Sequence, residues 1–218
     1  GRYDGTSRFP RDSRFVFNPS GSVAWVMSEE NFFEPARNIV NFLKFRFSYG
    51  SLGNQDLQSN YYAYLATMGS GKIGQILNGK QPVYVGAPGL VSANLTWETV
   101  TTADWGMDIN FLDNKLTATV DAYIRRTKDM LTAGAQLPNV IGTGEPLENA
   151  ADLKTVGWDL TINWRDRFML AGKPFNYGVG FNIGDSRAWI TKFSNETGTL
   201  DDYYEGYEIG SICGLVTD

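Results

Sequence analysis

Long stretches of alternating apolar and polar residues restrict most strongly what this chain can fold into. The odd positions of 101–111 are mostly apolar and include Trp105, whereas Asp104 and Asp108 stand at even positions. After the four residues LDNK the alternation resumes over 116–125. Because side chains of a β-strand point to opposite faces in turn, this period predicts strands with one apolar and one polar face.

The same period recurs elsewhere, although Pro19 and Gly21 interrupt the first stretch and predict a bulge there. Ser28 is expected to cap a short helical turn that contains Asn31 and Phe32. The sequence therefore predicts six strands, over residues 15–27, 41–49, 96–111, 116–130, 155–165 and 174–185.

The predicted connections alternate in length. Short ones lie at 28–38, 112–115 and 166–173, and long ones at 50–94, at 131–154 and after 185. Tight turns on one rim and extended loops on the other are typical of an up-and-down barrel. A soluble sandwich instead has turn signals every 8 to 12 residues or so, without this asymmetry.

Strand length indicates what the apolar face contacts. Eleven residues at about 3.3 Å each span about 36 Å, which a tilt of about 45° reduces to about 25 Å, the height of the apolar band of a membrane barrel. Strands of soluble domains typically have about 5 or 6 residues. The polar face of 41–49 also carries Lys44 and Arg46, which a dry core would leave without water. We therefore expect the apolar face to contact lipid and the polar face to line a wet lumen.

The composition excludes several classes of function. A net charge of −5 argues against nucleic-acid binding, which needs a clustered basic surface. Histidine is absent, which removes the commonest general base, and the single cysteine, Cys213, therefore has no histidine to activate it as a nucleophile. We expect no enzymatic activity, no catalytic residues, no metal site and no cofactor.

The charged residues of the predicted polar faces are the candidates for a substrate path. An alternative interpretation is a paired acid and base, or a cation site, formed by Asp104, Asp108 and Asp121. The lumen interpretation needs no such pairing, because a wet wall solvates carboxylates directly. The lumen candidates are Lys44, Arg46, Asp104, Asp108, Asp121 and Asp159.

Two groups of tyrosines fall in the predicted long-loop regions. Flat rings with a polar tip stack on sugars or rest on a partner protein, and they also pack large loops against one another. Both uses stay open at this point. The candidates for contact with substrate or with a lid are Tyr61, Tyr62, Tyr64, Tyr203, Tyr204 and Tyr207.

Several motifs together resemble a known family. They are RYDGTSRFPRDSRFVFNPSGSVAWVMSEENFF (2–33), LKFRFSYGSLGNQ (43–55), LTWETVTTADWGMDINFLDNKLTATVDAYIRRTKDML (95–131), GWDLTINW (157–164) and EGYEIGSICGLVTD (205–218). In these stretches the chain resembles the barrel of the SusC/RagA family of TonB-dependent outer-membrane transporters.

The resemblance implies an all-β fold, namely a section of a large antiparallel transmembrane barrel that has 22 strands in the family, with long extracellular loops and short periplasmic turns. It implies that residues 1–218 are part of one barrel domain whose plug and remaining strands lie outside this chain. It further implies TonB-dependent import of bulky nutrients, as oligosaccharides and other glycans or as peptides, through the outer membrane of a Gram-negative bacterium of the Bacteroidota type. The implied partners are a SusD-like surface lipoprotein, the TonB complex and outer-membrane lipid. The alternative is a soluble β-sandwich that binds carbohydrate.

Overall fold

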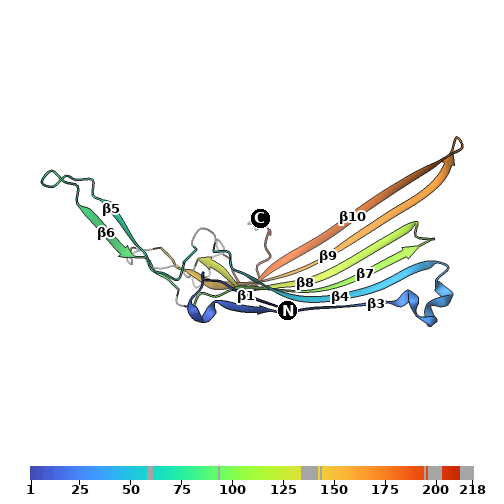
Figure 1. Cartoon of the computed structure of the whole chain (residues 1–218), viewed down its shortest axis with the longest axis horizontal. Helices are drawn as coiled ribbons and strands as arrows, with labels where there is room; N and C mark the ends of the chain where they lie inside the picture. The colour runs from blue at the N-terminus through green and yellow to red at the C-terminus, as the bar shows by residue number, and fades with distance from the viewer. Residues whose placement is uncertain are drawn as a thin grey trace, which may run out of the picture.

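The main sheet of the protein is a single antiparallel meander. The computed structural model describes residues 1–57, 61–92, 94–133, 142, 144–193, 195 and 203–211. Within these ranges six strands form the main sheet, in the order β10-β9-β8-β7-β4-β3 (Figure 1). They are β3 (Ser20–Val26), β4 (Val40–Asn54), β7 (Glu98–Phe111), β8 (Leu116–Ala133), β9 (Leu147–Leu170) and β10 (Lys173–Lys192).

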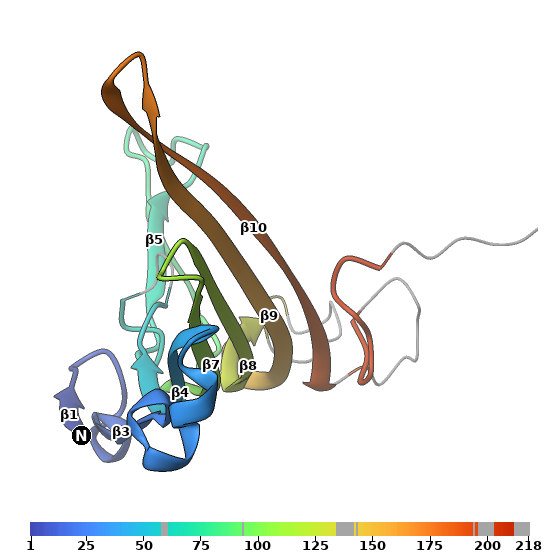
Figure 2. The ribbon, with the colours of Figure 1, turned by 90° about the vertical axis from the view of Figure 1, so that its right-hand side faces the viewer.

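The sheet is curved, and its apolar face is uncovered. Figure 2 shows the strands curling around an axis rather than lying flat. On the apolar face Val23, Val179 and Phe181 keep 64%, 65% and 56% of their surface exposed. A soluble domain buries such a face against a second layer. The structure therefore confirms the predicted fold class, an open section of a β-barrel.

The strand register confirms the predicted faces. Phe47, Trp105, Ala122 and Trp158 lie directly opposite one another across β4, β7, β8 and β9. Opposite residues of antiparallel strands share a face, so these four form one apolar row. The next row, on the other face, is polar and consists of Arg46, Gly106, Asp121 and Asp159.

The first predicted strand is divided at Pro19 rather than bulged. Residues Phe15–Asn18 form β2, which pairs with β1 (Arg2–Gly5) in a small separate sheet, whereas β3 joins the main sheet. Proline has no backbone N–H to continue a ladder. Its carbonyl oxygen instead accepts a hydrogen bond from the N–H of Ser51, at 2.9 Å.

The short helical connection exists, but the predicted role of Ser28 is wrong. The connection consists of two 3-10 helices, η2 (Met27–Glu29) and η3 (Asn31–Ala36); a third, η1, spans Arg11–Ser13. Val26 and Glu30 hold the N-cap positions of η2 and η3, without a side-chain cap. Because the turn begins at Met27, Ser28 lies inside η2, where it is buried. Among the described residues, no helix has the length and apolar composition needed to span a bilayer.

The hairpin between β9 and β10 is longer than predicted. The predicted turn over 166–173 shrinks to Ala171 and Gly172, because Lys173 pairs with Leu170. Both turn residues have positive φ angles, 50° and 75°, as a two-residue hairpin turn of type I′ requires. The predicted strands 155–165 and 174–185 are too short at their other ends as well, because β9 begins at Leu147, inside the predicted loop 131–154, and β10 continues to Lys192. Near the turn, Asp166 and Arg167 resemble loop residues and hide the alternation that continues to Phe168.

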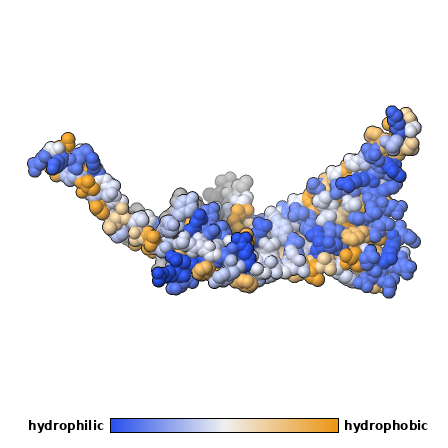
Figure 3. Space-filling view, in the orientation of Figure 1, coloured by the Kyte–Doolittle hydropathy of each residue, from blue (hydrophilic) through white to orange (hydrophobic). Residues whose placement is uncertain are grey.

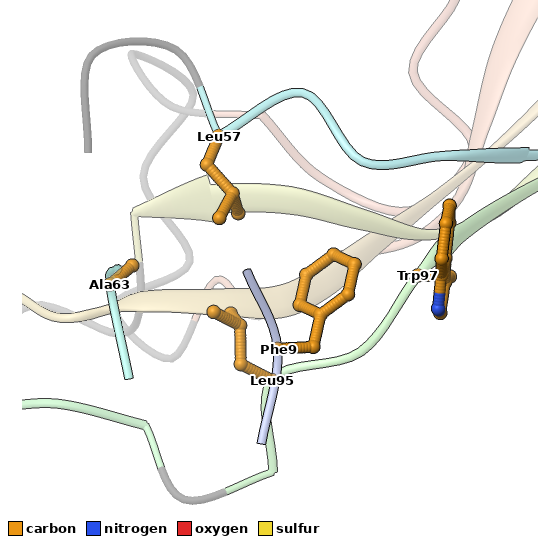
Figure 4. Packing of buried hydrophobic residues seen from close by; sticks show 5 residues of the cluster. All are labelled: Phe9, Leu57, Ala63, Leu95 and Trp97. Carbon is orange, nitrogen blue, oxygen red and sulfur yellow. The ribbon is translucent and has the colours of Figure 1, made fainter. Parts of the chain in front are cut away.

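The long-loop end of the sheet has its own small core and an arm. Phe9, Leu57, Ala63, Leu95 and Trp97 are buried together there (Figure 4). The arm is a hairpin of β5 (Met68–Lys72) and β6 (Val83–Pro88) that projects away from the main sheet. Figure 3 shows hydrophobic surface along this arm.

The tight turn between β7 and β8 is held by a side chain of β4. Leu112, Asp113 and Asn114 all have positive φ angles, of 53°, 56° and 64°, which is unfavourable for residues with a Cβ. The Oδ1 atom of Asn41 accepts hydrogen bonds from the backbone N–H groups of Asp113 at 2.7 Å and Asn114 at 3.3 Å. Asn41 stands at a break in register between Val40 and Phe42, so this bulge aims its side chain at the turn.

Replacing Asn41 by alanine is expected to lower the free energy of unfolding by about 1 kcal/mol. Two exposed hydrogen bonds to a strained turn are lost, and so is the one that Nδ2 of Asn41 donates to the carbonyl oxygen of Arg37 at 3.3 Å. Asn38→Ala is the control, because Asn38 lies in the same connection and the described residues show no side-chain hydrogen bond to it. Guanidinium titration of the full-length protein in lipid vesicles measures both. Equal effects of the two changes would show that Asn41 does not support the turn.

Arginine at two consecutive positions of β4 tests which face contacts lipid. Phe47 lies on the apolar face, where its ring contacts Trp105 at 5.5 Å between centroids, and Ser48 lies on the polar face opposite Asp104. Phe47→Arg is expected to cost about 2 to 4 kcal/mol near the bilayer midplane, and Ser48→Arg much less. The amount of heat-modifiable, folded full-length protein in the membrane fraction measures the difference. Equal loss from the two variants would contradict the assigned faces.

Candidate functional site

An arginine and two aspartates form an ion network at the centre of the polar face. Arg46 on β4 donates from Nε to Oδ2 of Asp108 at 2.9 Å, and from Nη2 to Oδ1 of the same residue at 3.2 Å. Its Nη2 also donates to Oδ1 of Asp121 on β8, at 2.9 Å. Arg46 thus joins three neighbouring strands through one guanidinium group. The three side chains keep 28% to 32% of their surface exposed, so the network is hydrated.

Gly106, which is not among the residues predicted from the sequence, makes this network possible. Gly106 lies between Arg46 and Asp121 in the register. A Cβ atom at this position would stand 2.5 Å from Cζ of Arg46 and 2.5 Å from Oδ1 of Asp121. The guanidinium group therefore lies across the space that a side chain would fill. A glycine in the middle of a strand is the signal that points to such a close approach.

Lys44 faces the same network without joining it. Lys44 is directly opposite Asp108, but Arg46 binds both oxygens of that carboxylate. The hydroxyl group of Thr119 donates a further hydrogen bond to Oδ1 of Asp108, at 3.2 Å. Within the described residues Lys44 has no ion pair, so its ammonium group stays available to the solvent on this face.

Asp104 and Asp159 lie on the polar face beside the network. Asp104 is opposite Ser48 and Tyr123, and Asp159 is opposite Asp121. No ion pair to either carboxylate occurs in the described ranges. The structure thus places all six lumen candidates on one face and brings three of them together. That any of them contacts substrate stays a prediction.

The arrangement gives no support to a catalytic pair or a cation site. Asp108 and Asp121 share one counter-ion, Arg46, whose guanidinium group lies between them and binds both oxygens of Asp108. Over the part of the chain that the structure describes, no three side chains are grouped to hold a metal ion.

The first tyrosine group lies in the loop that follows β4. The guanidinium carbon of Arg8 stands 4.8 Å from the ring centroid of Tyr61, and the rings of Tyr62 and Tyr64 meet edge to face at 6.5 Å. Tyr61 and Tyr62 remain more than half exposed. The group therefore contributes to loop packing on one side and offers ring surface to the solvent on the other.

The second tyrosine group packs mostly on itself. Tyr207 contacts Tyr203 and Tyr204, with ring centroids 5.9 and 5.2 Å apart, and Tyr203 contacts Phe193. The segment is attached to β10 because the N–H of Ile190 donates to the carbonyl oxygen of Tyr207 at 2.9 Å. Both predicted uses of these tyrosines remain open, although packing accounts for more of this second group.

One asparagine that the sequence analysis did not single out fixes the base of the long loops. Asn149 accepts a hydrogen bond from the N–H of Thr96 at 2.9 Å and donates to the carbonyl oxygens of Thr96 and Asp129, at 2.9 and 2.6 Å. It thereby connects the start of β9 to the segment before β7 and to the end of β8. The sequence alone gives no signal for this role, since its partners lie in distant segments.

Comparisons with known proteins agree with an open section of a β-barrel that has one apolar and one polar face. The family model described as TonB dependent receptor-like, beta-barrel matches residues 1–212. The chain is 31% identical over 207 residues to the TonB-dependent receptor SusC of Bacteroides thetaiotaomicron, covering 93% of this chain and 20% of SusC. It is 29% identical over 206 residues to the TonB-dependent receptor P3 of Formosa agariphila, covering 94% of this chain and 20% of that protein.

A solved structure of the RagAB peptide transporter has the same fold. It superimposes with a TM-score of 0.71 at 24% sequence identity, covering 88% of this chain and 20% of the transporter chain. The chain thus spans about a fifth of the length of these relatives. With a match over nearly its whole length, the chain belongs to the TonB-dependent receptor-like β-barrel family, as its resemblance to SusC/RagA transporters implied.

Proposed function

We propose that this chain forms part of the wall of an outer-membrane barrel that imports bulky nutrients by TonB-dependent active transport. Residues 1–218 belong to one barrel domain in this proposal, and the plug is a separate part of the protein. The cargo is an oligosaccharide or other glycan, or a peptide. A SusD-like surface lipoprotein assists at the extracellular side, and the TonB complex supplies energy through the plug.

The observation that carries this proposal is the division of one sheet into two chemically different faces. One face exposes a continuous apolar row that includes Trp105 and Trp158, and the other carries the hydrated network of Arg46. Lipid is the environment that stabilises the first face, and water stabilises the second. A barrel wall between a bilayer and a wet lumen satisfies both requirements at once.

The alternative of a soluble carbohydrate-binding sandwich is not supported. A sandwich covers the apolar face of each sheet with a second sheet about 10 Å away. Large apolar side chains of this face, such as Val179 and Phe181, are instead exposed in the structure. The family match over residues 1–212 also favours a barrel.

The relatives give partial support for partners and location. SusC and P3 are named TonB-dependent receptors, and RagAB is named a peptide transporter. By analogy we place this chain in the outer membrane of a Bacteroidota-type bacterium, with lipid against its apolar face. We assign it no bond-making or bond-breaking step and no cofactor, because transport requires positioned charges and rings rather than a reacting group.

Uptake by cells tests the proposed function. Deletion of the gene for the full-length protein is expected to abolish growth on one class of bulky glycan or peptide and to leave growth on the constituent monosaccharides or amino acids unchanged. Deletion of the gene for the lipoprotein partner is expected to impair the same growth. Unchanged uptake of every defined glycan and peptide offered would refute the import function.

Removal of the central cation is expected to weaken the barrel wall. Arg46→Gln leaves Asp108 and Asp121 without their counter-ion, at an expected loss of about 1 kcal/mol in the free energy of unfolding, after allowance for hydration. Lys44→Gln removes a cation from the same face of the same strand and is expected to change stability by less than about 0.5 kcal/mol. Denaturant titration of the full-length protein in lipid measures both, and a larger effect from Lys44→Gln would contradict the assigned network.

A further inference from the structure

Two cations lie directly opposite each other on the apolar side of the sheet. Arg126 on β8 pairs in register with Lys154 on β9. The pairs that precede them on the same face are Ile124 with Val156 and Ala122 with Trp158. Like charges at opposite positions of neighbouring strands destabilise a sheet. These two cations therefore require an explanation that strand pairing does not supply.

A third cation extends the group along β8. Lys128 follows Arg126 at the next position of the same face and is opposite Thr99 on β7. Arg126 and Lys128 are both exposed, and Lys154 is half-buried. We call Arg126, Lys128 and Lys154 the outer cation cluster. It lies on the side of the wall away from Arg46 and the polar face, so cargo inside a lumen would not meet it.

The outer cation cluster lacks a protein counter-ion. Within the described residues no ion pair involves any of its three members. Arg187 on the neighbouring strand differs, since its Nε lies 3.9 Å from Asp185 and 3.8 Å from Glu208. Glu205 is the acidic residue that shares a hollow with Lys154. Asp152, two positions before Lys154 on the same face of β9, accepts a hydrogen bond from the N–H of Asp129 at 2.9 Å and forms no ion pair with the cluster in the described ranges.

The position of the cluster along the strand matches one boundary of a bilayer. Leu116, opposite Trp164, begins β8 at the turn rim, and Arg126 lies ten residues further along. Ten residues at about 3.3 Å each, tilted by about 45°, rise about 23 Å. The apolar band of a membrane barrel is about 25 Å tall. The cluster therefore lies at the headgroup level on the side of the long loops.

An aromatic residue at the same level supports this placement. Trp189 on β10 is directly opposite Lys154, and both line a hollow of about 500 Å³ with Val156 and Gly206. Tryptophan is enriched where membrane barrels pass from acyl chains to headgroups, because its ring is apolar and its N–H is polar. Apolar residues such as Val156 thus lie on the midplane side of the cations and of the indole ring. This order fits an amphiphile that has acyl chains and an anionic head group.

We infer that the outer cation cluster binds the phosphate groups of a phosphorylated glycolipid of the outer leaflet, namely the lipid A part of lipopolysaccharide. The inference rests on the proposed membrane function, which places this face against lipid. Arg126 supplies a planar fork of N–H donors to phosphate oxygens, and Lys128 and Lys154 supply point charges. The bound phosphate offsets the repulsion between Arg126 and Lys154, and the acyl chains cover Val156 and Trp158.

Native mass spectrometry tests this site. It measures the binding of lipid A to the full-length protein, purified in detergent and delipidated. The double variant Arg126→Gln/Lys154→Gln is expected to lower the affinity at least about tenfold, as for the loss of charge-assisted contacts to phosphate. Arg125→Gln is the matched control, because Arg125 is the adjacent residue on the opposite face, with its guanidinium near Tyr123. Its affinity is expected to equal that of the unchanged protein.

Equal affinity of the double variant and the unchanged protein would overturn the inference, and so would an equal loss in Arg125→Gln. Two further probes identify the head group: dephosphorylated lipid A is expected to bind weakly, and phosphatidylglycerol less tightly than lipid A. If either probe bound as tightly as lipid A, the assignment to lipid A phosphates would be overturned.

The amount of each variant in the outer-membrane fraction and its nutrient uptake are measured in parallel. Absence of the unchanged protein from that fraction would refute the proposed function itself. Normal location and uptake without selective lipid A binding would refute the further inference alone.

Discussion

The register of the antiparallel ladder is the constraint on which the rest of the structure depends. A shift of one residue on any strand would move its apolar side chains to the wet face and its charges to the lipid. In the observed register Phe47, Trp105 and Trp158 share one face, and Arg46 and Asp121 share the other. The hydrocarbon core of a bilayer has no water to form hydrogen bonds with unpaired backbone N–H and C=O groups, so the ladder must stay continuous across it. The same ladder determines which side chains face lipid and which face water.

The ion network on the polar face depends on this register and also reinforces it. Arg46 reaches Asp121 two strands away only because Gly106 stands between them. A slipped β7 would put a side chain in the place of Gly106 and would separate Asp108 from Arg46. The network thus favours one alignment of three strands. Because it is hydrated, it contributes more to the choice of alignment than to overall stability.

The sequence predicted the strands and their faces, because the period of two repeats over many residues and averages out local exceptions. It did not predict the ends of β9 and β10, since Asp166 and Arg167 resemble a loop and the true turn depends on left-handed backbone at Ala171 and Gly172. The sequence also predicted which charged residues, such as Asp121, lie together on the polar face. Which of them pair was not predictable, because Arg46 and Asp121 lie 75 positions apart and meet only through the register.

The same alternation determines where cations are tolerable on the outer face. An arginine on the lipid face costs about 2 to 4 kcal/mol at the bilayer midplane but only about 0 to 1 near its boundaries. Arg126 and Lys154 on this face therefore place the membrane boundary just beyond Ile124 and Val156. At the other end Trp164, hydrogen-bonded through Nε1 to Tyr177 at 3.2 Å, marks the opposite boundary. Between these levels the apolar face carries charge only on β10 among the six described strands, where Asp185 and Arg187 lie opposite Trp158 and Val156 and within 3.9 Å of each other. The bilayer position thus follows from side-chain chemistry and register together.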